Sequence, residues 1–90
     1  MAEVRNNEGL SRFELEIGGH TAVANYRLSG DVMTFTHTEV PPAVRERGVA
    51  SRLVHDALTE ARAKGLKVIA RCSFVRHYID IHPEFQDLLA

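Results

Sequence analysis

The strongest pattern in this chain is a single apolar helical face in its second half. Hydrophobic residues recur at three- and four-residue spacing from Ala50 through Leu53 to Ala61, and Gly65 follows as a stop signal. The spacing predicts an amphipathic helix that ends near Lys64. Such a helix must bury its apolar side against other elements, which limits the folds open to the rest of the chain.

The start of this helix is unusual in its chemistry. The stretch Arg45–Ala50 offers no Ser, Thr, Asp or Asn to accept hydrogen bonds from the first backbone N–H groups. Arg47 and Arg52 add positive charge where the helix dipole is already positive. A bound anion would accept hydrogen bonds from those N–H groups and neutralise the arginines, and Gly48 would let it come close.

Alternating residues before the helix predict three antiparallel strands. Phe13, Leu15 and Ile17 alternate with charged residues, and a Gly18-Gly19 turn leads to a second strand over 21–28. A third strand is expected from Val32 to about Val40, ended by two prolines. On it, we expect one face to carry these four residues: Met33, Phe35, His37 and Glu39.

The segments after the helix complete the predicted fold. An apolar stretch over 66–72 is expected to return parallel to the third strand, and a short helix follows from Ser73. This gives an α+β fold with a mixed sheet of about four strands, an antiparallel meander followed by a parallel βαβ pair. We expect residues 1–10 to be a flexible, loop-like start and residues 11–90 to be one domain.

Composition excludes several classes of function. The net charge is -1, and no aromatic residues interleave with the arginines, so we expect no nucleic-acid binding. No apolar run approaches the roughly 20 residues that cross a bilayer, and the start lacks the apolar block of a signal peptide. The single cysteine fits a reducing compartment. We therefore expect a cytoplasmic protein without membrane contact and, since its histidines are scattered, without a metal site.

The predicted topology brings chemically active residues together. Ligands of sheets with parallel strands collect at the carboxyl ends of those strands, which here are the ends near Glu39 and Cys72. An anion at the helix start would therefore lie near His37, Glu39 and Cys72. The pattern is neither a Walker loop nor a three-glycine dinucleotide fingerprint, and it indicates a phosphate-bearing cofactor with its reactive end between the strands.

The same residues resemble a known family. Arg45-x-x-Gly48-x-Ala50 matches the Q/R-x-x-G-x-G/A pyrophosphate signature of the GNAT acetyltransferases, and it lies between a strand and its long helix, as in that fold. The span from about Phe13 to Leu89 resembles the minimal, single-domain GNAT-like acetyltransferases of the YjdJ type. That span includes His37-Thr38-Glu39-Val40-Pro41 before the loop and Cys72-Ser73-Phe74-Val75 after the next strand.

The resemblance implies an acetyl-coenzyme A-dependent N-acetyltransferase with a small amine or a lysine-bearing peptide as acceptor. It implies Cys72 and His37 as catalytic residues. From its place beside them, Glu39 is a further candidate base. The residues expected to hold the cofactor are Val40, Arg45, Glu46, Arg47, Gly48, Val49, Ala50 and Ser51.

Two catalytic routes and one competing function remain open from the sequence. Cys72 could take the acetyl group and pass it on, or an amine could attack directly with His37 or Glu39 as base and Tyr78 as a candidate acid. Cys72 could instead be an inert small residue, and His37 a hydrogen-bonded interior histidine. The competing function is a coenzyme A-binding or protein-interaction module without turnover, because the chain lacks the extra helices that enclose the acceptor in larger relatives.

Overall fold

The computed structural model describes residues 3–90, and for Glu46 and Arg47 it describes the backbone only. Five strands form one sheet in sequence order: β1 (Val4–Asn7), β2 (Arg12–Ile17), β3 (His20–Ser29), β4 (Val32–Glu39) and β5 (Lys67–Ala70). Helix α1 (Val49–Ala63) connects β4 to β5, and α2 (Ser73–Ile81) follows β5. Three 3-10 helices complete the chain: η1 (Glu8–Leu10), η2 (Pro42–Arg47) and η3 (Pro83–Leu88).

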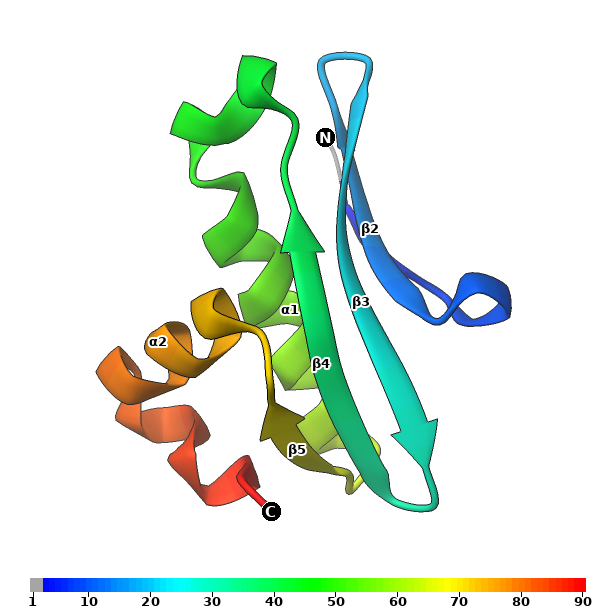
Figure 1. Ribbon diagram of the computed structural model, residues 1–90, viewed down its shortest axis with the longest axis vertical. Helices are drawn as coiled ribbons and strands as arrows, with labels where there is room; N and C mark the ends of the chain where they lie inside the picture. Colours follow the sequence, from blue (N-terminus) through cyan, green and yellow to red (C-terminus); the bar gives the residue numbers. More distant parts are fainter. Residues whose placement is uncertain (1–2) are drawn as a thin grey trace.

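The strand pairing confirms the predicted α+β architecture. Strands β1 to β4 are antiparallel neighbours, and β4 and β5 are parallel. The long helix α1 therefore forms the crossover of a βαβ unit, with a short helix after it (Figure 1).

In the described part of the chain, the helices cover one face of the sheet (Figure 1). Buried side chains of α1, α2 and η3 share one hydrophobic core with the inward residues of the sheet, among them Phe13, Ala24 and Phe35. In Figure 1, α1 runs along the sheet with α2 and η3 on the same side of β4. The opposite face carries polar side chains, and we call it the bare face. Across the described residues, no helix is both long and apolar enough to cross a bilayer.

Strand β1 and helix η1 correct the expectation of a loop-like start for residues 4–10, and residues 1 and 2 lie outside the described part of the chain. Val4–Asn7 pair antiparallel with β2 at the edge of the sheet. Asn6 anchors the strand, because its Oδ1 accepts a hydrogen bond from Tyr26 Oη at 2.7 Å and its Nδ2 donates to Glu60 Oε2 at 2.6 Å. Asparagine is unfavourable in strands, so these tertiary contacts override a local pattern that indicated a loop.

A β-bulge in β4 corrects the predicted faces of that strand. Tyr26 pairs with Phe35 and Asn25 pairs with His37, so Thr36 is an extra residue between the two pairs. The Thr36 hydroxyl donates to the Asn25 carbonyl at 3.4 Å.

The bulge reverses the side-chain alternation in the last part of β4. Met33 is buried in the core as expected, but His37 and Glu39 lie on the bare face, with 61% and 73% of their side-chain surface exposed. Thr38 and Val40 turn toward the helices instead: Thr38 pairs with the buried Ala24, and Val40 packs against the core.

Candidate functional site

A cavity lies beside the part of β4 that extends beyond the end of β5. Parallel pairing of the two strands ends at Phe35, whose carbonyl accepts hydrogen bonds from the backbone N–H groups of both Arg71 and Cys72. From there the chain turns into α2, while β4 continues to Glu39. The cavity has a volume of about 460 Å³ and is lined by His37, Thr38, Glu39, Val40, Arg45, Ala50 and Phe74.

The start of α1 borders this cavity through Ala50 and has the uncapped form that the sequence predicts. Helix η2 leads into it, held to the core by Val44, which is 2% exposed. Gly48 follows with a φ of 66°, a left-handed conformation that glycine adopts without strain, and α1 begins at Val49 with no side-chain cap. A Cβ on Gly48 would meet no atom within 4 Å, so the space beside it is open.

The predicted cofactor-binding residues differ in their positions around the helix start. Val40, Arg45 and Ala50 line the cavity, and Arg45 Nε donates to the Val40 carbonyl at 3.0 Å. Val49 is buried in the core, so only its backbone could reach a ligand there, whereas Ser51 is exposed in the first turn.

Glu46 and Arg47 were also predicted to bind the cofactor. Their backbone belongs to η2, and their side chains lie outside the described part of the chain. Their predicted contribution through side chains therefore stays a prediction.

Cys72 occupies the N-cap position of α2, at the amino end of that helix. Its Sγ lies 3.3 Å from Thr38 Oγ1. Partial burial acts to raise the pKa of the thiol, but hydrogen bonds from the Thr38 hydroxyl and from the backbone N–H groups of Val75 and Phe74 outweigh it. The pKa of Cys72 therefore lies below its ordinary value, which favours the nucleophilic thiolate.

His37 lines the cavity, whereas Cys72 is not among its lining residues and lies behind Thr38. His37 Nε2 lies 3.7 Å from Glu39 Oε2, so the two predicted bases form a pair with each other. The alternative of an interior histidine is wrong, because the ring is mostly exposed. Among the described residues, Thr38 is the side chain that contacts the Cys72 sulfur, and no hydrogen bond joins that sulfur to His37.

Thr38 and Phe74 are site residues that the sequence reasoning missed. Thr38 was placed on the face away from the predicted bases, and only the bulge at Thr36 brings it to Cys72. Tyr78, the candidate acid, lies apart from the cavity-lining residues: it is buried and stacks on His82 with ring centroids 3.8 Å apart. Burial raises the pKa of Tyr78 above its ordinary value.

Comparisons with known proteins point to one family. The sequence profile described as GCN5-related N-acetyl-transferase matches residues 12–88. The Gallus gallus protein NATD1 is 30% identical over 84 residues, which are 90% of this chain and 76% of that protein. The Mus musculus protein NATD1 is 30% identical over 83 residues, covering 89% of this chain and 76% of that protein.

A solved structure has the same fold. The solution structure of a GCN5-like candidate N-acetyltransferase from Staphylococcus aureus superposes with a TM-score of 0.75 at 26% sequence identity. The match covers 98% of this chain and 87% of that one.

Proposed function

Because the chain belongs to the GCN5-related N-acetyltransferase family, we propose that it transfers an acetyl group from acetyl-coenzyme A to an amine. The observation that carries the proposal is the 460 Å³ cavity, which is lined by Ala50 at an uncapped helix start and by Thr38, whose hydroxyl contacts the Cys72 thiol. Bound there, acetyl-coenzyme A would supply an activated thioester.

The residues around the helix start suit the pyrophosphate of such a cofactor. The first backbone N–H groups of α1 point out of the helix without a side-chain cap, and the positive end of the helix dipole favours an anion. Arg45 lies at the same place, with its Nε held on the Val40 carbonyl. Gly48 leaves the approach open, so the residues present fit the group.

The edge of β4 beyond Phe35 suits the amide-bearing arm of the cofactor. Because the chain leaves the sheet after β5 ends at Ala70, no strand among the described residues lies beside residues 36–39 on that side. Backbone groups at an open strand edge bind extended amide chains as an added strand would. This arrangement supports a thioester positioned beside Thr38 and Cys72.

Cys72 would act in a covalent route of two steps, acetyl transfer to its sulfur and then from its sulfur to the amine. Its thiolate Sγ forms a bond to the acetyl carbonyl carbon while the bond from that carbon to the coenzyme A sulfur breaks. A neutral amine then attacks the acetyl-cysteine, and the new C–N bond replaces the C–S bond. The proton that the nitrogen loses passes to His37 or Glu39, and the Cys72 thiolate is restored. The Thr38 hydroxyl would stabilise the thiolate before and after transfer.

His37 and Glu39 would serve the amine in this route and in direct transfer. Both are exposed to solvent at the cavity, within 3.7 Å of each other, where an incoming ammonium can lose its proton. In the direct route the same amine attacks the thioester itself, and Cys72 forms no bond. The two routes therefore differ in their need for the sulfur.

Measuring coenzyme A release with Cys72→Ala separates these routes, with Ser73→Ala as the control at the neighbouring exposed position. For the covalent route we expect release to fall at least about 100-fold, in the range of a lost nucleophile, and an acetylated Cys72 to appear by mass spectrometry in the wild type. Near-normal turnover of Cys72→Ala would contradict the covalent route and leave direct transfer.

A coenzyme A-binding module without turnover is the competing function. The observation that favours it is that the thiol and the imidazole have separate partners, Thr38 and Glu39. Binding of acetyl-coenzyme A without self-acetylation, hydrolysis or transfer to a panel of amines would establish the module and contradict the enzyme.

A further inference from the structure

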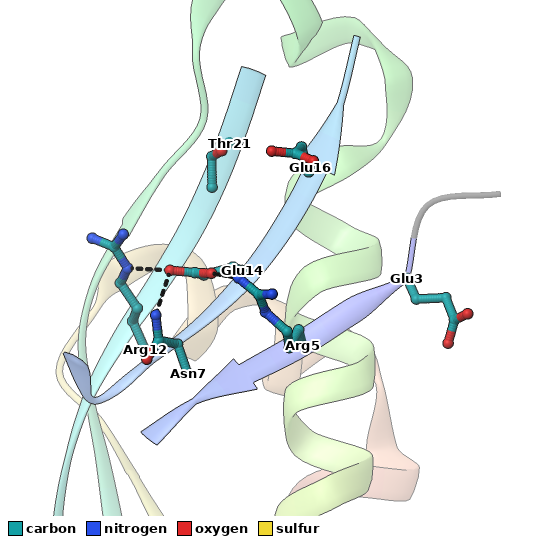
Figure 2. A pocket seen from close by; sticks show the side chains of 7 residues that line it. All are labelled: Glu3, Arg5, Asn7, Arg12, Glu14, Glu16 and Thr21. Atoms are coloured by element: carbon teal, nitrogen blue, oxygen red, sulfur yellow. Dashed lines mark hydrogen bonds and ion pairs between the residues drawn. The ribbon is translucent and has the colours of Figure 1, made fainter. Parts of the chain in front are cut away.

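The bare face of the sheet contains a second cavity that the proposed cofactor site does not use. It has a volume of about 540 Å³ and lies over β1, β2 and the start of β3. Its charged lining comes from Glu3, Arg5, Arg12, Glu14 and Glu16 (Figure 2). These residues come from separate segments that strand pairing brings together.

Glu14 organises this cavity. It is 7% exposed, and three side chains donate to its carboxylate: Arg5 Nη2 to Oε1 at 2.7 Å, Arg12 Nε to Oε2 at 2.7 Å and Asn7 Nδ2 to Oε2 at 3.1 Å. The hydrogen bonds from Arg5, Arg12 and Asn7 lower the pKa of Glu14 to about 2. The carboxylate is thus ionised at neutral pH and holds both guanidinium groups in place.

Arg12 is left with donors directed outward. Only its Nε bonds to Glu14, and its two terminal amino groups make no hydrogen bond with any described residue. Figure 2 shows them pointing away from Glu14. The Arg12 side chain is 35% exposed, so the group is both oriented and accessible. An oriented pair of guanidinium N–H donors binds a carboxylate through two parallel hydrogen bonds.

The charge of the cavity selects among anions. Two guanidinium groups and three carboxylates give the lining a net charge of −1. A phosphate dianion would meet about twice the repulsion from the glutamates that a single carboxylate meets, and an accompanying ammonium group offsets the repulsion of the carboxylate. The lining therefore favours a zwitterion over a phosphate ester.

Strand register places Arg12, at one end of this cavity, two strands away from the proposed catalytic edge. Arg12 pairs with Asn25, which pairs with His37, and in the next row Glu14 pairs with Val23, which pairs with Glu39. All these residues lie on the bare face. Two strand spacings, about 10 Å, separate the backbones of Arg12 and His37. Because the side chains of both residues extend toward a ligand, an amino acid of five or six carbons can span the remaining distance.

We propose that the bare face binds acceptor amines that carry a carboxylate, with the carboxylate on Arg12 and the amine directed toward His37 and Glu39. This rests on the proposed function, whose acceptor class it narrows to ω-amino acids and to lysine or peptides that present a free carboxylate nearby. Simple alkylamines would lack the group that Arg12 holds.

A titration followed by amide NMR, without acetyl-coenzyme A, tests the cavity directly. The probes are 6-aminohexanoate and hexylamine, which differ in the carboxylate. We expect saturable shifts at Arg12, Asn25 and His37 with 6-aminohexanoate, and binding at least about tenfold weaker for hexylamine. Arg12→Gln should weaken 6-aminohexanoate binding about tenfold, while Arg27→Gln, an exposed arginine on the same face, should not.

The outcomes separate this inference from the proposed function. Equal binding of the two probes, or no saturable shift on the bare face, would overturn the inference with the wild-type protein alone, whatever the stability of Arg12→Gln. Acetylation of hexylamine as fast as 6-aminohexanoate would also overturn it and would leave acetyl transfer intact. Failure to bind acetyl-coenzyme A, with 6-aminohexanoate still bound at Arg12, would overturn the proposed function instead and leave a carboxylate site.

Discussion

The cavity at the start of α1 and the cavity over Glu14 have similar volumes, about 460 and 540 Å³, but their polar groups are arranged differently. At the first, the helix begins without a side-chain cap, and His37, Glu39 and Arg45 are exposed. At the second, Glu14 is buried and bonded to three neighbours.

This difference separates groups that await a ligand from groups that also hold the sheet together. Arg5 and Asn7 belong to the edge strand β1, and their bonds to Glu14 tie that strand to β2. Changes at the first cavity should therefore alter binding with little effect on the fold. Changes at Glu14 should alter stability first.

The largest effect is expected from a charge placed in the first cavity. Ala50→Glu puts a carboxylate at the helix start, where it would occupy space and repel the pyrophosphate. Repulsion of this kind costs several kcal/mol, so we expect the affinity for coenzyme A to fall at least about 100-fold by calorimetry. Ala63→Glu, exposed at the other end of α1, is the control and should leave affinity unchanged. Equal losses in both variants would contradict a site at the helix start.

Glu14→Gln should have the largest effect on stability. The amide keeps the size of the side chain but removes the charge that Arg5 and Arg12 share, and buried charge-assisted hydrogen bonds are worth about 2 kcal/mol or more. We expect chemical denaturation to give a free energy of unfolding lower by about 2–3 kcal/mol. Glu16→Gln, exposed on the same strand, should change it by less than about 0.5 kcal/mol. A stable Glu14→Gln would mean that the network does not hold β1.

Acid should reveal the same network through its pH dependence. The pKa of Glu14 is lowered to about 2 in the folded chain, from an ordinary value of 4.5, so the unfolded state binds the proton more tightly. The stabilisation is present above the unfolded pKa and is lost as the pH falls from about 5 toward 2. The free energy of unfolding, measured by denaturation at several pH values in that range, should fall more steeply with decreasing pH in the wild type than in Glu14→Gln. Parallel pH profiles would disprove the contribution of Glu14.

Arg45→Ala should produce the smallest of these effects. Arg45 is exposed and its Nε bonds the Val40 carbonyl, so its loss removes one cation from the helix start and loosens the loop. We expect coenzyme A affinity to fall about tenfold, the equivalent of about 1.4 kcal/mol, with stability nearly unchanged. Arg27→Ala tests whether any exposed arginine matters equally. If it does, the effect is one of net charge and not of position.

Local sequence signals were sufficient to predict the βαβ unit and the helix start. The spacing of apolar residues in α1, the prolines after β4 and Gly48 each act within a few residues of their position, and the structure has all three features. The resemblance to GNAT acetyltransferases agreed with that local information and is confirmed by the family match.

Features that depend on contacts between strands were not predictable from the sequence. The extra residue Thr36 carries no glycine or other local signal, and it becomes visible only through the pairing of Asn25 with His37. For that reason, the sequence predicted the wrong face of the sheet for His37 and Thr38. Strand β1 was missed because Asn6 is held by Tyr26 and Glu60, which lie far away in the sequence.

The central claim is that acetyl-coenzyme A binds at the start of α1 and along the end of β4, and amide NMR during its titration is the most direct test. We expect saturable shifts at Val40, Arg45, Gly48 and Ala50, with Thr38 and Cys72 shifting at the thioester end. The amide signals of Arg5 and Glu14 should not shift. Absence of shifts across residues 45–52, or shifts confined to the cavity over Glu14, would contradict the account.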